Sequence, residues 1–243
     1  MTNYVIHPIP LAEMTIDKSM LKYRCDFGQK YTQLVYVWYL EGPGEKILVD
    51  AGVSVEYLVK ERELPSKEIQ PLESGLKQLG LVPEDITLVI VTHLHSDHIA
   101  EGYKLPNARF IIQKTELDFA RNPHPTVAGQ YPSRFIEGLN YQTVEGDTEI
   151  CDGISVISTP GHSPGGQSVA VQTAKGLAII TGQCTIDENF APPEKVARTM
   201  QVIPPGVLVN LFDVYDSLLK VKQMADIIIP NHEPKYVQIS RIP

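Results

Sequence analysis

A strand-like segment that ends in a cluster of metal-binding side chains is the feature that most limits how this chain can fold. Residues 88–92 are apolar and rich in Val and Ile, a pattern typical of a buried strand. The next residues supply four potential ligands and read His93-Leu94-His95-Ser96-Asp97-His98. Imidazole nitrogens and a carboxylate suit a borderline cation such as zinc, and a strand end lets alternate residues face one cleft. The sequence therefore predicts a metal site at the end of this strand.

The spacing within this cluster separates it into two pairs. His93 and His95 are two residues apart, so both can face the same side of an extended segment. Asp97 and His98 follow after the chain turns and can serve a second metal position. A lone histidine is more often a packed or surface residue than a ligand. Three histidines and an aspartate beside an apolar strand, however, are costly to bury without a cation, and this favours the metal interpretation.

Two further histidines, His7 and His124, stand outside every motif. For His7, at the edge of an N-terminal strand, we expect a surface or packed residue. His124 lies between two prolines in residues 122–132, the most irregular segment of the chain. We expect this segment to form a surface loop or lid, with His124 exposed in it and a role in a substrate lid as the alternative.

Apolar runs of strand length recur along the chain and predict a fold rich in β-strands. At 243 residues the chain is long enough for a sizeable core, and we expect one domain over residues 1–243. The predicted strands are 4–9, 34–40, 46–50, 88–92, 109–113, 154–158, 168–172, 177–181 and 227–230. Hairpins are expected around 41–44 and 174–176, and helices at 68–79, 115–121 and 207–224. Because the helices are interspersed and do not alternate strictly with strands, a two-sheet core flanked by helices is favoured over a doubly wound parallel sheet.

Charge and composition exclude several classes of partner. The net charge is -8 and residues of both signs are mixed, so the basic stripe that nucleic acid requires is missing. We expect no membrane association, because no segment approaches a membrane span or has the pattern of a signal peptide, and a cytoplasmic location is expected. The three cysteines cannot all pair within one chain and are interpreted as reduced thiols.

The pattern HxHxDH in residues 93–98 is the hallmark of the metallo-β-lactamase superfamily, which the chain resembles over nearly its whole length. Residues 47–52 look like the family's early strand and Asp-x-Gly turn. Residues 158–165 look like the loop that supplies a third histidine, and residues 228–232 match the segment with its last metal-binding histidine. The resemblance implies an α/β fold, the αβ/βα sandwich, in which two mixed β-sheets pack together and are flanked by helices.

The resemblance also implies a role for each ligand. It assigns to a first metal the residues His93, His95 and His162. It assigns to a second metal the residues Asp97, His98 and His232. Asp97 is expected to act in catalysis as well, by taking a proton from the attacking water or returning one to the leaving group. Asp50, the last residue of a predicted strand, is expected to orient a ligating histidine, with the capping of a turn as the alternative.

Within the superfamily the chain resembles most the N-acyl homoserine lactonase group, the quorum-quenching lactonases. The likeness rests, in order and spacing, on residues 138–142, 145–147, 159–165 and 167–168. It implies a metal-dependent, zinc-type hydrolase in which metal-bound hydroxide opens a lactone or a related ester or amide bond of a small molecule. The implied cofactor is one or two zinc ions, with manganese and iron as alternatives, and a homodimer is left open.

The place of the family's bridging aspartate is occupied differently here. The segment reads Ile180-Thr181-Gly182-Gln183-Cys184. Registered on the glycine, Gln183 replaces the carboxylate, and a neutral amide predicts a weak second site or a single metal. Shifted by one residue, Cys184 resembles the cysteine ligand of one class of true β-lactamases, and its thiolate could hold the second ion. In the third interpretation Cys184 is an ordinary small side chain beside the pocket.

A second departure concerns the substrate. The lactonases place a tyrosine shortly after the bridging aspartate, and residues 184–187 contain none. Either another donor, such as Tyr103 or Tyr131, takes its role or the substrate differs. Alternative functions are a thioesterase of the same fold, a mononuclear iron enzyme similar to the sulfur dioxygenases, and a ligand binder that has lost turnover; metal analysis and a substrate screen distinguish them.

Overall fold

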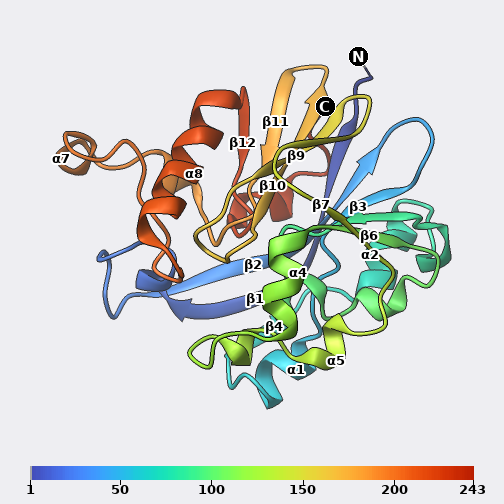
Figure 1. The fold of residues 1–243 in the computed structure, drawn as a ribbon, viewed down its shortest axis with the longest axis horizontal. Helices are drawn as coiled ribbons and strands as arrows, with labels where there is room; N and C mark the ends of the chain where they lie inside the picture. The colour runs from blue at the N-terminus through green and yellow to red at the C-terminus, as the bar shows by residue number, and fades with distance from the viewer. Residues whose placement is uncertain (1) are drawn as a thin grey trace.

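Two mixed β-sheets pack against each other, and helices cover their outer surfaces (Figure 1). The computed structural model describes residues 2–243. The first sheet has seven strands in the order β4-β1-β2-β3-β5-β6-β7: β1 Val5–Asp17, β2 Lys30–Glu41, β3 Ile47–Val49, β4 Ser66–Glu68, β5 Leu88–Ile90, β6 Arg109–Gln113 and β7 Tyr141–Val144. The second has five strands in the order β12-β11-β10-β9-β8: β8 Thr148–Cys151, β9 Ile154–Ser158, β10 Gln167–Thr173, β11 Gly176–Ile180 and β12 Ile227–Ile229.

The central strands are apolar on both sides because each of their faces is covered. One face of each sheet contributes to a shared apolar cluster that includes Trp38, Ile90, Val156, Val169 and Ile180. The opposite faces pack against helices, as expected for strands buried on both sides. This arrangement confirms the predicted α/β sandwich of two mixed sheets flanked by helices.

Short helices and the longer α8 complete the outer layers. The α-helices are α1 Val55–Lys60, α2 Leu72–Gln78, α3 Ser96–Ile99, α4 Lys114–Arg121, α5 Ser133–Ile136, α6 Asp187–Phe190, α7 Glu194–Ala197 and α8 Leu211–Met224. The 3-10 helices are η1 Lys18–Met20, η2 Pro83–Asp85, η3 Gly102–Lys104, η4 Ala128–Gln130 and η5 Pro234–Gln238. None of the helices in residues 2–243 combines the length and the apolar character that crossing a membrane demands.

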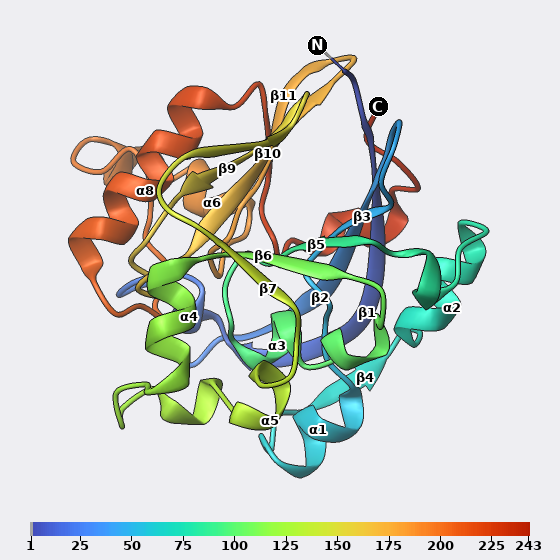
Figure 2. The same cartoon turned by 45° about the vertical axis from the view of Figure 1, so that its right-hand side comes forward.

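The helix α8 shows how the sequence builds one outer layer. The side chain of Asn210 accepts the backbone N–H groups of Phe212 and Asp213 and so caps the first turn. Buried Val214, Leu218 and Val221 recur at helical spacing, and Leu218 and Val221 pack on the second sheet. Figure 2 shows α8 beside β9 and β10, while α1, α2 and α5 lie on the other side of the molecule.

Both predicted hairpins are confirmed, as antiparallel pairs of β2 with β3 and of β10 with β11. Several predicted boundaries are wrong. The strand predicted at 4–9 continues to Asp17, and the helix predicted at 68–79 begins only at Leu72, because residues 66–68 pair with β1 and Pro71 precedes the helix. The helix predicted at 207–224 begins at Leu211 after its Asn210 cap. The short strands β7 and β8 were not predicted.

The loops that follow β3, β5, β9, β11 and β12 meet at one end of the sandwich. Backbone bonds connect them: Ala51 N–H donates to His98 O at 2.7 Å, and His232 N–H donates to Thr185 O at 3.1 Å. Gln167 N–H donates to the Thr92 carbonyl at 2.9 Å. Segments far apart in sequence are thereby fixed around one cleft.

Candidate metal centre

Three imidazole nitrogens converge in a first cluster formed by His93, His95 and His162. His93 Nε2 lies 3.1 Å from His95 Nδ1 and 3.2 Å from His162 Nε2. All three side chains are buried. The loop after β5 supplies two of the rings and the loop after β9 supplies the third, as the sequence predicted.

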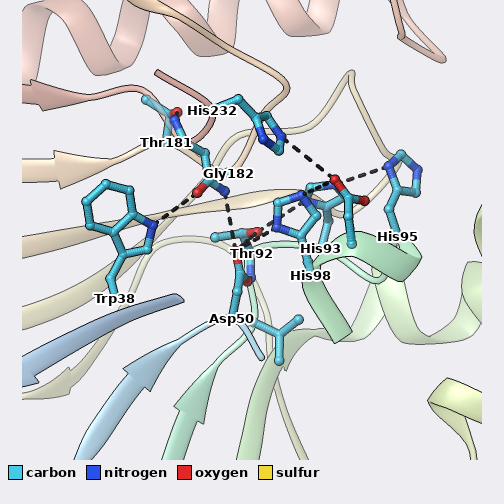
Figure 3. Close-up of polar contacts among 12 residues, drawn as sticks. Trp38, Asp50, Thr92, His93, His95, His98, Thr181, Gly182 and His232 are labelled. Atoms are coloured by element: carbon cyan, nitrogen blue, oxygen red, sulfur yellow. Dashed lines mark hydrogen bonds and ion pairs between the residues drawn. The ribbon is translucent and has the colours of Figure 1, made fainter. Parts of the chain in front are cut away.

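A second cluster lies beside the first and is formed by Asp97, His98 and His232. Asp97 Oδ2 lies 3.3 Å from His98 Nε2 and 3.9 Å from His232 Nε2. The Asp97 side chain keeps 20% of its surface exposed, whereas both histidines are buried. Asp97 therefore reaches from the cluster into the open cleft. Figure 3 shows the rings of His93, His98 and His232 on the same side of Asp50.

Hydrogen bonds of the outer ring nitrogens indicate where the protons lie. His162 Nδ1 is 2.7 Å from the Val207 carbonyl oxygen, and His232 Nδ1 is 2.8 Å from that of Leu34. Because a carbonyl only accepts, each Nδ1 donates, and a neutral ring then keeps its lone pair on Nε2. Burial lowers the pKa of His162 to about 4 and also lowers the pKa of His232. Both rings are thus neutral near pH 7, the state in which imidazole binds a metal.

Asp50 lies behind the second cluster and accepts several hydrogen bonds there. Its fully buried carboxylate accepts Thr92 N–H at 2.7 Å and the Thr92 hydroxyl at 2.9 Å. It also accepts His98 Nδ1–H at 2.7 Å, and a longer bond of 3.3 Å comes from Asn231 Nδ2. Trp38 Nε1–H in turn donates to Asn231 Oδ1 at 3.1 Å. Asp50 itself has a left-handed φ of 63°, so the backbone adopts an unfavourable conformation to place this carboxylate.

The charges at this end of the molecule fit a divalent cation. Burial opposes ionisation of Asp97, but His98 outweighs it and holds the pKa of Asp97 well below its usual range. Burial also opposes a charge on His98, but the carboxylates of Asp97 and Asp50 raise the pKa of His98 to about 10. The two carboxylates therefore favour a positive charge at the His98 ring, which either the proton of the ring or a cation bound at Nε2 in place of that proton can supply. His98 Nε2 is buried without a hydrogen-bond partner among residues 2–243, which leaves an atom suited to ligation.

The ligand atoms of the two clusters also fit a divalent cation. Five imidazoles and one carboxylate form the two clusters. Imidazole with carboxylate oxygen suits zinc and related first-row ions, and a nearby carboxylate that receives the outer N–H of a ligating histidine is a common arrangement. The residues present thus fit a bound metal.

Glu116, in the first turn of α4, joins the two loops of the first cluster and was missed in the sequence. Its fully buried carboxylate accepts Leu94 N–H at 3.0 Å and Gly165 N–H at 2.9 Å. Leu94 lies inside the HxHxDH segment, and Gly165 lies in the loop of the third histidine. A side chain at Gly165 would overlap the backbone nitrogen of Glu116. A signal existed in the sequence, because Glu116 and the buried Ala120 share one helical face, so a charge stands on an apolar face.

The segment expected to replace the bridging aspartate lies between the loops of His162 and His232. Gln183 is fully buried, and its Nε2 donates to the Thr159 carbonyl at 3.1 Å, while its Oε1 has no partner among the described residues. Cys184 lines the cleft, but its sulfur belongs to neither cluster of converging ligand atoms. Burial, reinforced by the charge of Asp97, raises the pKa of the Cys184 thiol.

The two tyrosines considered as replacement donors do not line the cleft. Tyr103 is 69% exposed on η3. Tyr131 is buried with its ring 4.9 Å from that of His95, and its hydroxyl donates to Glu116 at 3.4 Å. Tyr131 therefore packs behind the first cluster, and neither tyrosine is among the described residues that line the cleft.

The two histidines outside the motifs lie away from the clusters. His7 is partly buried and its Nε2 lies 2.8 Å from Glu41 Oε2, in agreement with a structural role. His124 is exposed in the irregular segment, with its Nδ1 2.7 Å from the Thr126 hydroxyl. The same segment reaches the cleft through Gln130.

The cleft in front of the two clusters is largely apolar. His95, Asp97, His162 and His232 form its inner end. Its apolar walls are formed by Met14, Ile16, Met20, Leu58, Leu64 and Val207. Its polar residues outside the clusters include Gln33, Arg62, Ser96 and Gln130. An apolar cavity with a few convergent polar groups is typical of a site for a small molecule.

Comparison with known proteins agrees with this geometry. The profile of the metallo-beta-lactamase superfamily matches residues 32–222. An N-acyl homoserine lactonase of Bacillus cereus is 30% identical over 208 residues, which cover 78% of this chain and 80% of the relative. The N-acyl homoserine lactonase AttM of Rhizobium radiobacter is 26% identical over 230 residues, covering 85% of this chain and 84% of the relative.

A solved structure shows the same similarity in three dimensions. An N-acyl homoserine lactone hydrolase, with the product N-hexanoyl-L-homoserine bound at its catalytic metal center, superposes with a TM-score of 0.79. The superposition covers 98% of this chain and 96% of that chain at 26% sequence identity. The chain belongs to the metallo-beta-lactamase superfamily and is a lactonase-like, metal-dependent hydrolase.

Proposed function

We propose that this enzyme uses zinc to hydrolyse the ring ester of a small lactone. The observation that carries the proposal is the pair of clusters at the inner end of an apolar cleft, with Asp97 belonging to a cluster and also lining the cleft. The lactonases similar to the chain over most of its length support the same reaction. We propose the ligands as assigned by sequence: His93, His95 and His162 for one ion, and Asp97, His98 and His232 for another.

The positions of the residues suggest a role for each of them in the proposed reaction. A bound divalent cation lowers the pKa of water and polarises a carbonyl oxygen. Asp97, partly exposed at the cleft, is placed to take a proton from water and return it to the leaving alkoxide of the opened ring. His98 is held in one orientation by Asp50, and His162 by the Val207 carbonyl. The apolar walls exclude water from the substituent of the lactone.

A substrate panel tests this reaction directly. Purified enzyme with its metal is compared on N-hexanoyl-homoserine lactone, on a hexanoyl thioester and on a hexanoyl aryl ester. We expect the highest kcat/KM for the lactone, with one carboxylate formed on the open-chain product and one proton released for each ring opened. A preference for the thioester would replace the proposal by a thioesterase. Iron as the bound metal, with oxygen consumed on a persulfide, would replace it by a sulfur dioxygenase.

The role of Glu116 gives a prediction on metal affinity. Glu116→Ala removes the acceptor that joins the two ligand loops, and we expect the dissociation constant for zinc to rise by about 10-fold to 100-fold. Competition with a chromophoric chelator measures it. Asp118→Ala, on an exposed part of the same helix, is the matched control and should leave the affinity unchanged. Equal affinity in the Glu116→Ala variant and the wild type would show that the loops hold their geometry without this carboxylate.

The segment after β11 gives a prediction on metal count. We propose that Gln183 stands at the position of the bridging aspartate, and its buried Oε1 without a partner supports this register. Gln183→Asp should then raise the metal content toward two ions per chain, because it adds a negative charge between two cations. Cys184→Ser should leave the content unchanged. Loss of an ion in Cys184→Ser, together with zinc protection of the wild-type thiol from alkylation, would instead make Cys184 the ligand.

A further inference from the structure

Gln33 on β2 is a polar side chain that the metal chemistry does not explain. It lines the cleft and is only 2% exposed. Its Oε1 is buried and has no hydrogen-bond partner among residues 2–243. A buried acceptor without a partner destabilises the folded state, so a side chain of this kind is expected to meet a partner from outside the chain.

The position of Gln33 brings it next to the second cluster. The following residue, Leu34, binds His232 twice: its carbonyl lies 2.8 Å from His232 Nδ1, and its N–H donates to the His232 carbonyl at 3.3 Å. Leu34 packs into the core between the two sheets. Because side chains alternate along a strand, Gln33 points to the opposite side, where the cleft lies.

The cleft wall around Gln33 is apolar, so its amide can discriminate between substrates with and without a hydrogen-bond donor. Its partner across the strand pair is Met14, which also lines the cleft, and Ile16 continues the same apolar wall. Of the polar residues in the cleft outside the two clusters, Arg62 and Gln130 are partly exposed to solvent. Within residues 2–243, Gln33 is the cleft-lining side chain whose buried oxygen lacks a partner.

We propose that Gln33 is a specificity-determining residue that accepts a hydrogen bond from an N–H or O–H group on the substrate, beside the scissile ester. This inference rests on the proposed lactone hydrolysis and adds the residue that selects among lactones, in favour of those whose ring substituent carries a hydrogen-bond donor. In the free enzyme this buried oxygen stays unpaired among residues 2–243. A substrate donor that reaches it forms the missing hydrogen bond, whereas an analogue without the donor leaves the oxygen unpaired.

A matched pair of lactones tests the proposal. One is N-hexanoyl-homoserine lactone, and the other is α-hexanoyloxy-γ-butyrolactone, in which oxygen replaces the amide N–H. We expect the wild type to prefer the amide by at least about tenfold in kcat/KM, because the other substrate leaves a buried acceptor unpaired. Gln33→Met, which is similar in size and has no amide, should remove the preference by slowing the amide substrate and not the ester. Thr32→Leu, at the exposed neighbouring position of β2, should keep the preference.

Two further measurements separate this inference from its alternatives. Gln33→Met should melt at the same temperature as the wild type or higher, because it removes a buried oxygen that no protein group satisfies. Calorimetry measures binding of the open-chain product N-hexanoyl-homoserine, and we expect Gln33→Met to bind it more weakly than the wild type. If neither lactone is hydrolysed but this difference in binding is found, the proposed function is wrong and the role of Gln33 stands. If the wild type hydrolyses both lactones equally, or Gln33→Met keeps the amide preference, the role of Gln33 is wrong while lactone hydrolysis stands.

Discussion

His162→Ala is expected to lower lactone hydrolysis by at least about a thousandfold while the chain remains folded. The ring supplies one of three nitrogens in the first cluster, and its Nδ1 is already fixed by the Val207 carbonyl. Losing that ligand weakens the polarisation of the carbonyl and of water, which is worth several kcal/mol of transition-state stabilisation. Since about 1.4 kcal/mol corresponds to a factor of ten in rate, a thousandfold loss follows. Steady-state kinetics at saturating zinc, with circular dichroism to check the fold, measure the effect.

The matched control for this substitution is His124→Ala. The His124 side chain is exposed, and its polar contacts among the described residues are to Thr126 alone. Activity should therefore stay within about twofold of the wild type, as surface changes rarely matter. Comparable losses in both variants would mean that the irregular segment takes part in catalysis. An unchanged rate in His162→Ala would remove this residue from the site.

Asp50→Ala is expected to destabilise the enzyme more than other substitutions near the site. The fully buried carboxylate accepts bonds from Thr92, His98 and Asn231, and alanine leaves these buried donors without their acceptor. Removing one partner of a buried charged pair lowers the free energy of unfolding by about 3–5 kcal/mol. The ring of His98 also loses its orientation, so zinc affinity should fall by about 10-fold to 100-fold. Denaturant unfolding and chelator competition report the two effects separately.

Two controls distinguish the charge of Asp50 from its shape. Asp50→Asn keeps an acceptor oxygen, so it should unfold at a denaturant concentration closer to that of the wild type while still binding zinc more weakly. Asp147→Ala removes a carboxylate that is 54% exposed and paired with Lys220, and it should change stability by less than about 1 kcal/mol. If Asp50→Ala and Asp147→Ala unfold with equal free energies, the hydrogen bonds of Asp50 do not stabilise the site.

The ligand positions could be predicted because their signal is local. Residues 93–98 carry four of the six cluster members on one short segment after an apolar strand, and the loops around His162 and His232 each follow another strand. Parallel pairing of β3 with β5 and of β11 with β12 then places those strand ends at one end of the sandwich. Short-range pattern and family resemblance therefore sufficed for this part of the site.

Asp50 was predicted as a residue that orients a histidine, but the other supporting residues were not, because they act through contacts that are distant in the sequence. The bond from Trp38 to Asn231 joins residues 193 positions apart, and neither residue type indicates a role by itself. Gln33 follows Thr32 near the start of β2 and looks like an ordinary polar residue until the cleft is known. Such roles arise from tertiary packing, which cannot be read from the spacing of residues along the chain.

Element boundaries failed where burial is incomplete. The strands β7 and β8 are only partly buried, so they lack the apolar runs by which the other strands were recognised. The second half of β1 alternates buried Met14 and Ile16 with the partly exposed Thr15, a half-covered pattern where a continuous apolar run was sought.

The most direct test of the central claim is the metal content of the purified enzyme, measured together with lactone hydrolysis before chelation, after chelation and after zinc is restored. We expect zinc in the wild type, and we expect removal of the metal to abolish hydrolysis and to lower the melting temperature, because a bound ion stabilises only the folded chain. Adding zinc back should restore both. A protein that holds no metal, and that keeps its rate of lactone hydrolysis and its melting temperature in the presence of chelator, would contradict the claim.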